Sequence, residues 1–388
     1  MKKLSAITDN LKGQAMFGLM AKAQEMERSG RKIIHFEIGD PDFNTPSRVK
    51  EAAKVALDAN FTHYTNSMGL REFREAVALY TESNWGFRPT LPQILICPAN
   101  AAIDFAARCV VNQGEEVIYP DPGFPTYHSV IHYNGMIPVP VQLKEENKFR
   151  MDPSDVAARI TDKTRLVIMN SPSNPTGSVM TKDEILGMAD IAKKHDLYLL
   201  SDEIYSKLTY GKIHHSPSVV DKCRERTILL CGLSKIYSMT GWRLGYVVGP
   251  EDLIKKMGLL LETILSCLPA FTQLAGVSAL QGDQDFLRER IEILRQRRDL
   301  LVKRLNALPA VSCIVPEGAF YVFLNIAKTG MTADEYSVRL LDSTGVCALP
   351  GNCFGKFGEE YVRFSYGSVS VEMIKEALDK MREFHNNL

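Results

Sequence analysis

The amino-acid sequence predicts an α/β fold: a large domain with a doubly wound, mostly parallel sheet, joined to a smaller α/β domain. Between about residues 46 and 281, short apolar runs of strand length alternate with segments of helical periodicity, which is the pattern of strands joined by crossover helices. Small and polar residues cluster directly after these apolar runs, as they do where ligands bind at the carboxyl ends of parallel strands. From Pro250 onward, long amphipathic helices take over.

Length and charge limit the possible functions. The 388 residues, 45% of them hydrophobic, suffice for a sizeable core and two domains. The 46 basic and 46 acidic residues leave no net charge, which argues against nucleic acid or an anionic membrane as the main partner.

Two further features of the composition indicate the compartment. The N-terminal residues are too polar for a secretory segment, and no run reaches the roughly 20 apolar residues that span a bilayer. The eight cysteines form no Cys-x-x-Cys pair and no metal-ligand spacing, so we expect no disulfide and no metal site. The sequence therefore predicts a cytoplasmic protein with reduced thiols.

Apolar periodicity places the individual elements along the chain. Strands are expected at 33–36, 93–96, 116–119, 166–169, 197–202, 227–230, 311–314, 319–324, 346–349 and 361–365. Helices are expected at 11–30, 46–59, 101–111, 182–195, 252–266, 271–281, 285–308, 333–343 and 371–384. We interpret the first helix as a packing or subunit-exchange arm. The arginines of the helix at 285–308 are interleaved with glutamates and leucines, which indicates a solvated face rather than a nucleic-acid stripe.

One lysine and one arginine stand out chemically. Lys235 follows the strand expected at 227–230, and its neighbours are apolar or small. Lysine avoids burial unless paired, and an amine in such surroundings loses its proton more easily and becomes a nucleophile. Arg243 follows eight residues later, between Gly241 and Gly245, and offers a permanent cation with a planar fork of donors that suits a phosphate.

This stretch, Ser-Lys followed by Gly-x-Arg-x-Gly, resembles the signature of pyridoxal-phosphate enzymes of the class I/II aminotransferase family, fold type I. The resemblance implies that Lys235 forms the internal aldimine with pyridoxal 5′-phosphate and that Arg243 binds the cofactor's phosphate. Gly232 stands where the family frequently has a serine that donates to this phosphate. Either Ser234 or water would compensate, or cofactor binding would be somewhat weaker.

Other motifs extend the resemblance toward the phosphate and the ring. A helix that starts directly after the strand at 93–96 offers free amide donors to an anion; in the family these amides bind the phosphate, and they map to Ala99 and Asn100. Pro98 stands where the family commonly has glycine. Phe124 lies in a loop stiffened by prolines and matches the aromatic residue that stacks on the cofactor ring.

The segment from Asn170 to Gly177 closely resembles the family's Asn-x-Pro-x-Asn-Pro-Thr-Gly motif. Asn174 would donate to the ring oxygen and bind the substrate carboxylate, and Pro172 and Pro175 are candidates for cis peptide bonds. Asp202 ends an apolar run, and a carboxylate so placed needs a cation, for which the protonated pyridine nitrogen would serve.

The remaining matches concern the ring oxygen, the substrate and a second subunit. Tyr205 would be the second donor to the ring oxygen. Gly39 matches a glycine whose backbone lies against the substrate carboxylate, and Arg363 matches the arginine that binds this carboxylate bidentately. Tyr64 matches a tyrosine that reaches the phosphate of the neighbouring subunit, which implies a homodimer with shared sites.

The resemblance covers nearly the whole chain and implies transamination between an α-amino acid and a 2-oxo acid, with Lys235 moving the proton. The fold would be like that of aspartate aminotransferase: a large domain of residues 46–281 and a small domain of residues 1–45, which include the arm, and 282–388. Relatives that cleave C–S bonds by β-elimination or decarboxylate amino acids share these residues and are the alternative. A regulatory module that binds the cofactor without catalysis is more remote.

The nature of the substrate side chain depends on where cations lie. Relatives that prefer dicarboxylic amino acids commonly have a basic residue near the phosphate turn or in the partner subunit. Here the turn has Asn100, and the segment 263–271 has no cation. Since an unpaired buried carboxylate costs several kcal/mol, we expect a neutral or aromatic amino acid rather than aspartate, unless Lys12 or Lys22 of the arm closes over the site. Glutamate stays open as the amino donor of the second half-reaction.

Overall fold

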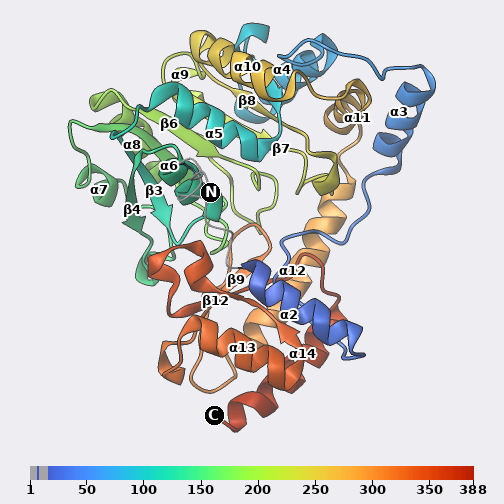
Figure 1. Cartoon of the computed structure of the whole chain (residues 1–388), viewed down its shortest axis with the longest axis vertical. Coiled ribbons are helices and arrows are strands. Elements are labelled where there is room, and N and C mark those ends of the chain that lie inside the picture. Colours follow the sequence, from blue (N-terminus) through green and yellow to red (C-terminus); the bar gives the residue numbers. More distant parts are fainter. Residues whose placement is uncertain (1–6, 8–15) are drawn as a thin grey trace, which may run out of the picture.

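The computed structural model describes residue 7 and residues 16–388 of the chain, and in it a large sheet with its helices lies at one end and two small sheets at the other (Figure 1). The large sheet has seven strands in the order β2-β8-β7-β6-β5-β3-β4. These strands are β2 (Ile94–Cys97), β3 (Glu116–Asp121), β4 (Ile137–Gln142), β5 (Thr164–Asn170), β6 (Tyr198–Asp202), β7 (Thr227–Gly232) and β8 (Gly245–Val248). Only β8 pairs antiparallel with its neighbours, so the predicted fold class is confirmed.

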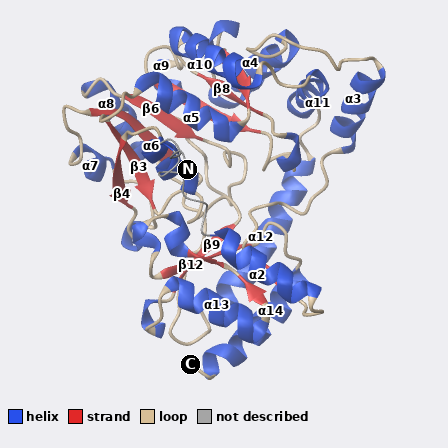
Figure 2. Cartoon of the chain, in the orientation of Figure 1, coloured by secondary structure: helices blue, strands red, loops and turns tan. Residues whose placement is uncertain are grey.

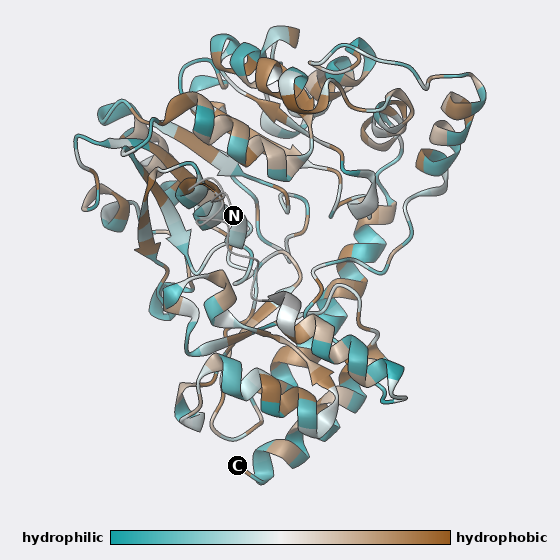
Figure 3. Cartoon of the chain, viewed as in Figure 1, coloured by the Kyte–Doolittle hydropathy of each residue, from teal (hydrophilic) through white to brown (hydrophobic). Residues whose placement is uncertain are grey.

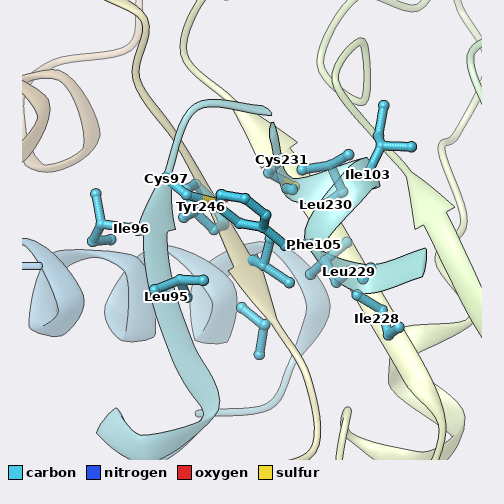
Figure 4. Packing of buried hydrophobic residues seen from close by; sticks show 14 of the residues in the cluster. Leu95, Ile96, Cys97, Ile103, Phe105, Ile228, Leu229, Leu230, Cys231 and Tyr246 are labelled. Carbon is cyan, nitrogen blue, oxygen red and sulfur yellow. The ribbon is translucent and has the colours of Figure 1, made fainter. Parts of the chain in front are cut away.

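Helices flank the strands of this sheet (Figure 2). They are α3 (Ser47–Asp58), α4 (Arg71–Trp85), α5 (Ala99–Val110), α6 (Pro125–Tyr133), α7 (Pro153–Ala157), α8 (Lys182–Lys194), α9 (Ser218–Asp221), α10 (Glu251–Leu265) and α11 (Ala270–Gln281). Hydrophobic and hydrophilic residues alternate along them (Figure 3), because one face of each helix packs on the sheet or on another helix. The largest buried cluster lies where Phe105 of α5, Leu229 of β7 and Tyr246 of β8 meet (Figure 4).

The smaller end of the molecule is built from segments far apart in the sequence. Its two-stranded sheet pairs β1 (Ile34–His35) with β10 (Val346–Cys347) in parallel, and its three-stranded sheet has the order β11-β12-β9. The latter strands are β9 (Tyr321–Asn325), β11 (Leu349–Pro350) and β12 (Tyr361–Ser365). The helices here are α2 (Met16–Arg28), α13 (Ala333–Thr344) and α14 (Val371–Asn386). The domain boundaries drawn at 45/46 and 281/282 stay a prediction.

The long helix α12 (Phe286–Leu305) leads from the large sheet to the small ones (Figure 1). In the described part of the chain, no helix combines the length and the apolar character needed to cross a membrane.

Most of the expected elements are present, with shifted ends. Helix α5 begins at Ala99 rather than at Ala101, and the expected cis bonds precede Pro172 and Pro175, as one also precedes Pro122. The part of the first helix expected at 11–15 lies outside the described residues.

Two of the expected strands differ from those in the structure, and several elements were not foreseen. The strand expected at 311–314 is reduced to an isolated bridge between Ser312 and Asn325. The strand expected at 346–349 is split, because Val346 and Cys347 pair with β1 whereas Leu349 and Pro350 pair with β12. Strands β4 and β8 and helices α4 and α6 were not foreseen. β4 carries prolines that deter a strand prediction, but it lies at the sheet edge, where a missing amide donor is tolerated.

At the end of β3, the part of the molecule built on the large sheet contacts the part built on the small sheets. The buried carboxylate of Asp121 accepts from the amide of Lys356 at 3.2 Å and from that of Phe357 at 3.1 Å, and the Gly123 amide donates to the Phe354 carbonyl at 2.7 Å. Gly355 lies directly against Asp121, since a Cβ atom there would be 2.1 Å from Oδ1. Its φ of 132° and ψ of 172° also require glycine.

We expect Gly355→Ala to lower the free energy of unfolding by about 2 to 4 kcal/mol, because strained backbone and overpacking add. Chemical denaturation followed by circular dichroism measures the change. The matched control is Gly330→Ala: Gly330 also has a positive φ, of 74°, but no atom lies within 4 Å of the added Cβ. A loss for Gly355→Ala no larger than that of the control would contradict the contact with Asp121.

Candidate active site

A cavity of about 360 Å³ lies at the carboxyl ends of the large sheet's parallel strands and extends to the small sheets. All predicted site residues except Tyr64 line it. The lining residues are Met20, Glu37, Ile38, Gly39, Ala99, Asn100, Ile103, Phe124, Asn170, Asn174, Asp202, Ile204, Tyr205, Leu230, Ser234, Lys235, Thr240, Arg243, Tyr321 and Arg363.

Lys235 enters the cavity from the turn that follows β7. Its Nζ donates to the carbonyl oxygen of Gly39 at 2.5 Å, and no carboxylate of the described residues forms an ion pair with it. Burial lowers the pKa of Lys235 to about 8; Asp40 opposes this shift, while the charges of Arg363 and Arg243 add to it. An amine with this pKa is partly unprotonated near neutral pH, as a nucleophile or base requires.

Asp202 lies at the end of β6 and is 5% exposed. Its Oδ2 accepts from the hydroxyl of Tyr127 at 2.6 Å, and its Oδ1 accepts from the amide of Ile204 at 3.2 Å. Burial raises the pKa of Asp202 to about 6, although both of these hydrogen bonds oppose the shift. Within the described chain, no basic side chain pairs with this carboxylate, so the site holds an acidic group that lacks a cation.

Arg363 presents the opposite case. Its guanidinium, on β12, is buried and donates to Oδ1 of Asn174 at 3.1 Å and to the carbonyl oxygen of Glu37 at 2.5 Å. The rings of Tyr321 and Phe354 lie 4.6 and 4.7 Å from it. Among the described residues no carboxylate forms an ion pair with Arg363, and its Nε has no hydrogen-bond partner. The fold therefore holds a buried cation ready for a ligand carboxylate.

At the other end of the cavity, the first turn of α5 meets the loop after β7. The first amides of a helix have no acceptor inside it, and here they belong to Ala99 and Asn100. Gly245 allows the first turn of α5 to lie this close to the chain, because a Cβ atom at position 245 would lie 3.3 Å from the amide nitrogen of Ala99. Arg243 is exposed at the rim, has a left-handed φ of 55°, and donates to the carbonyl oxygen of Thr240 at 2.8 Å.

The glycine at position 232 has a packing reason. A Cβ atom there would lie 2.3 Å from Cδ1 of Ile204, so the isoleucine occupies the space of any side chain at this position. Ser234 and Thr240, which carry hydroxyl groups, also line the cavity. Compensation by Ser234 stays a prediction.

Three predicted residues contribute in different ways. Phe124 lines the cavity and packs edge-on against Tyr127, with ring centroids 5.7 Å apart. Gly39 must be glycine, since a Cβ atom would lie 2.5 Å from the hydroxyl oxygen of Tyr321. Tyr64 does not reach the cavity of its own chain and is 90% exposed.

Sequence reasoning missed Tyr127, Asn170 and Tyr321. Asn170 accepts from the amide of Asn174 at 2.9 Å and belongs to the motif already recognised, so its role could have been inferred. Tyr127 and Tyr321 have the pattern of ordinary core residues, and only the folded structure places Tyr321 at the cavity and Tyr127 against Asp202.

The charges of the cavity define what fits into it. Arg243 and Arg363 offer cations without a paired anion in the described chain, Lys235 offers an amine that is partly unprotonated near neutral pH, and Asp202 offers a buried carboxylate without a cation. This set is complementary to a phosphate, a carboxylate and a protonated ring nitrogen. The residues present therefore fit pyridoxal 5′-phosphate together with an amino acid.

Comparisons with known proteins agree with this geometry. The family model Aminotransferase class I and II matches residues 31–381. The chain is 38% identical over 368 residues to an aspartate aminotransferase of Pyrococcus horikoshii, covering 94% of this chain and 93% of that protein. It is also 38% identical over 358 residues to aromatic-amino-acid aminotransferase 2 of Thermococcus litoralis, covering 90% of this chain and 91% of that protein.

The structure of the aspartate aminotransferase from Rhizobium meliloti superposes with a TM-score of 0.94 at 32% identity, over 100% of this chain and 99% of that one. The chain therefore belongs to the class I and II aminotransferase family.

Proposed function

We propose that this aminotransferase transfers the amino group of an α-amino acid to a 2-oxo acid with pyridoxal 5′-phosphate, and that Lys235 carries the reaction. The observation that carries the proposal is the lowered pKa of Lys235 in a cavity where Arg363 lacks an anion and Asp202 lacks a cation. A cofactor and a substrate would supply both counterions.

The proposed roles of the cofactor-binding residues follow from their positions. The cofactor, when bound, supplies an electron sink for the bonds at the substrate's Cα. Asp202, held by Tyr127, would keep a proton on the ring nitrogen. Asn174 and Tyr205 would donate to the ring oxygen, and Phe124 would pack on the ring. The phosphate would be held by a set of donors: the amides of Ala99 and Asn100, Ser234 and Arg243.

The substrate-binding residues would fix the bond that breaks. Arg363 would bind the α-carboxylate with two parallel hydrogen bonds, while Asn174 and the backbone of Gly39 lie beside it. With the carboxylate fixed, the Cα–H bond is oriented toward Lys235. The unprotonated amine of Lys235 would then take the proton from Cα, and the hydrogen bond to Gly39 would hold the amine in place.

The charges around the substrate side chain favour a neutral or aromatic amino acid. The two arginines of the cavity are assigned to the phosphate and to the α-carboxylate, and Lys235 is assigned to the proton at Cα. Met20 and Ile38 add apolar surface. Lys22 pairs with Asp342 at 2.7 Å and does not line the cavity, whereas Lys12 lies outside the described residues. Because known relatives include both aspartate and aromatic-amino-acid aminotransferases, the substrate class needs a direct test.

A homodimer is part of the proposal. Near Tyr64, large apolar side chains are exposed: Phe61 by 47%, Ile264 by 51% and Leu265 by 47%. The loop that carries Tyr64 is fixed against the 262–273 segment, since the Thr65 hydroxyl donates to the Leu268 carbonyl at 3.2 Å. Such a patch favours a protein interface. We also place the enzyme in the cytoplasm, since all eight cysteines are free.

Sodium borohydride should fix the cofactor covalently on Lys235, because this amine is the reactive one in the cavity. Peptide mass mapping of the reduced protein locates the adduct, and Lys235→Ala should abolish it. Lys207→Ala is the matched control: burial also lowers the pKa of Lys207, but its amine donates to Asn84 outside the cavity. An adduct on any other lysine would refute the assignment.

Subunits that carry Tyr64→Phe should complement subunits that carry Lys235→Ala. If Tyr64 acts across the interface, a heterodimer has one site with both residues intact and one site with neither. Activity after mixing should therefore exceed the sum of the two separate variants. The control is the double variant mixed with wild-type protein. If both single variants fold and exchange subunits but their mixture gains no activity, a shared site is excluded.

A single-turnover scan should identify the substrate class. We expect neutral or aromatic amino acids to convert the bound cofactor to its aminated form at least about tenfold faster than aspartate, because a distal carboxylate would be buried unpaired. Absorbance measures the conversion, and Asn100→Lys, which adds a cation at the turn, should raise the relative rate with aspartate. Fastest conversion by aspartate in the wild type would refute this class. Release of ammonia together with a 2-oxo acid, without conversion of the cofactor to its aminated form, would indicate elimination instead, and release of CO2 with an amine would indicate decarboxylation.

A further inference from the structure

We propose that Tyr321 is a positioning residue: its hydroxyl donates to the hydroxyl of Tyr205 and thereby leaves the proton of Tyr205 free to point at the cofactor's ring oxygen. This inference rests on the proposed function and assigns a role to a residue for which no motif of the sequence gave one.

The two phenols form a closed pair. Tyr321 begins β9 and is 1% exposed, and Tyr205, which follows β6, is 3% exposed. Their hydroxyl oxygens lie 2.6 Å apart, and their rings pack edge-on with centroids 5.7 Å apart. No other hydrogen bond to either hydroxyl is present in the part of the chain that the structure describes.

Proton counting leaves two arrangements. A phenol has one proton to donate, so in this pair one hydroxyl donates and the proton of the other is left unused. If Tyr205 were the donor to Tyr321, it would have no proton for the ring oxygen. If Tyr321 is the donor, the proton of Tyr205 is available to the cavity, which Tyr205 lines.

The charge of Arg363 selects the second arrangement. The guanidinium carbon lies 4.6 Å from the ring centroid of Tyr321, and a cation beside a phenol makes it more acidic and a stronger donor. Burial raises the pKa of both tyrosines, and the charge of Arg363 opposes this shift in each. Of the two phenols, it is Tyr321 whose ring lies against the guanidinium. Tyr321 is therefore the better donor of the two.

On its other side, the Tyr321 hydroxyl packs directly against the backbone. It faces Gly39 so closely that a Cβ atom there would lie 2.5 Å from the hydroxyl oxygen. The carbonyl oxygen of Gly39 accepts from Lys235. Tyr321 is thus enclosed by Gly39, Arg363 and Tyr205, three residues to which substrate or cofactor contacts are assigned.

The two parts of the Tyr321 side chain have separable tasks. The ring lies against the guanidinium of Arg363, and the hydroxyl binds Tyr205. Tyr321→Phe removes only the hydroxyl and keeps the ring under Arg363. Tyr321→Leu removes both, so it should also weaken binding of the substrate carboxylate.

The test uses the holoenzyme and follows the visible absorption of the bound cofactor as a function of pH. A donor to the ring oxygen stabilises the form in which this oxygen is more negative and so lowers the apparent pKa of the chromophore. Tyr321→Phe removes the hydrogen bond that orients and polarises the Tyr205 hydroxyl, so Tyr205 becomes a weaker donor to the ring oxygen although its proton stays available. We expect the midpoint to rise by about half to one pH unit, the equivalent of one ordinary hydrogen bond. The KM for the amino acid should stay within about twofold of the wild type, whereas Tyr321→Leu should raise it by about tenfold.

Comparison variants make the outcome decisive. Tyr205→Phe should raise the midpoint more than Tyr321→Phe, and the double variant should not exceed Tyr205→Phe, since Tyr321 acts through Tyr205. Tyr366→Phe is the control: Tyr366 is fully buried, its hydroxyl donates to that of Tyr210 at 3.1 Å, and it does not line the cavity. The pH midpoint of the cofactor's absorption change in Tyr366→Phe should equal that of the wild type.

Two results would overturn the inference. An unchanged midpoint in Tyr321→Phe alongside a raised one in Tyr205→Phe would show that the hydroxyl of Tyr321 does not position Tyr205. A double variant in which both shifts add would show that Tyr321 acts independently. Failure of the wild type to bind the cofactor at all would instead overturn the proposed function, so the two failures are distinguishable.

Discussion

The site depends on a separation of buried charge. Arg363 and Asp202 are both almost fully buried, and in the described chain neither has an ion-pair partner. A charge in this state costs several kcal/mol unless polar groups hold it. Asn174 and the Glu37 carbonyl hold the cation, while Tyr127 and a backbone amide hold the anion. These hydrogen bonds offset only part of the cost. A ligand with a carboxylate and a protonated nitrogen would relieve the rest, so the cavity is complementary to such a ligand.

The strand order explains how these groups meet. In register, Asn170 of β5 lies beside Asp202 of β6, and Asp202 lies beside Leu230 of β7. The last residues of β5 and β6 therefore meet the carboxyl-terminal end of β7 at one edge of the sheet. The antiparallel strand β8 then pairs Gly245 with Gly232. The loop between β7 and β8 must therefore start and end at this edge, and for this reason Lys235 and Arg243 share the cavity although eight residues separate them.

Patterns among neighbouring residues predicted the strands and motifs whose structure depends on those neighbours. Apolar runs identified β5, β6 and β7, and the motif around Asn174 and the Lys235–Arg243 stretch identified groups that the structure brings together. Pairing between distant segments could not be predicted: the split at Ala348 arises because its two sides join different sheets. Tyr321 could not be found because a buried tyrosine in a strand has no local feature that separates catalytic support from packing. The role of Tyr64 concerns a second chain, and the sequence motif remains its basis.

The reactivity of Lys235 is tied to the same charges. Burial lowers its pKa, Asp40 opposes this effect, and the charges of Arg363 and Arg243 add to it. A phosphate on Arg243 and a carboxylate on Arg363 would offset both arginine charges, so those two contributions weaken once ligands are bound. Exclusion of water is then the main force that keeps the amine of Lys235 unprotonated. In the proposed mechanism, the apolar surface of Met20 and Ile38 at the cavity would thus serve the proton transfer as well as the fit of the substrate side chain.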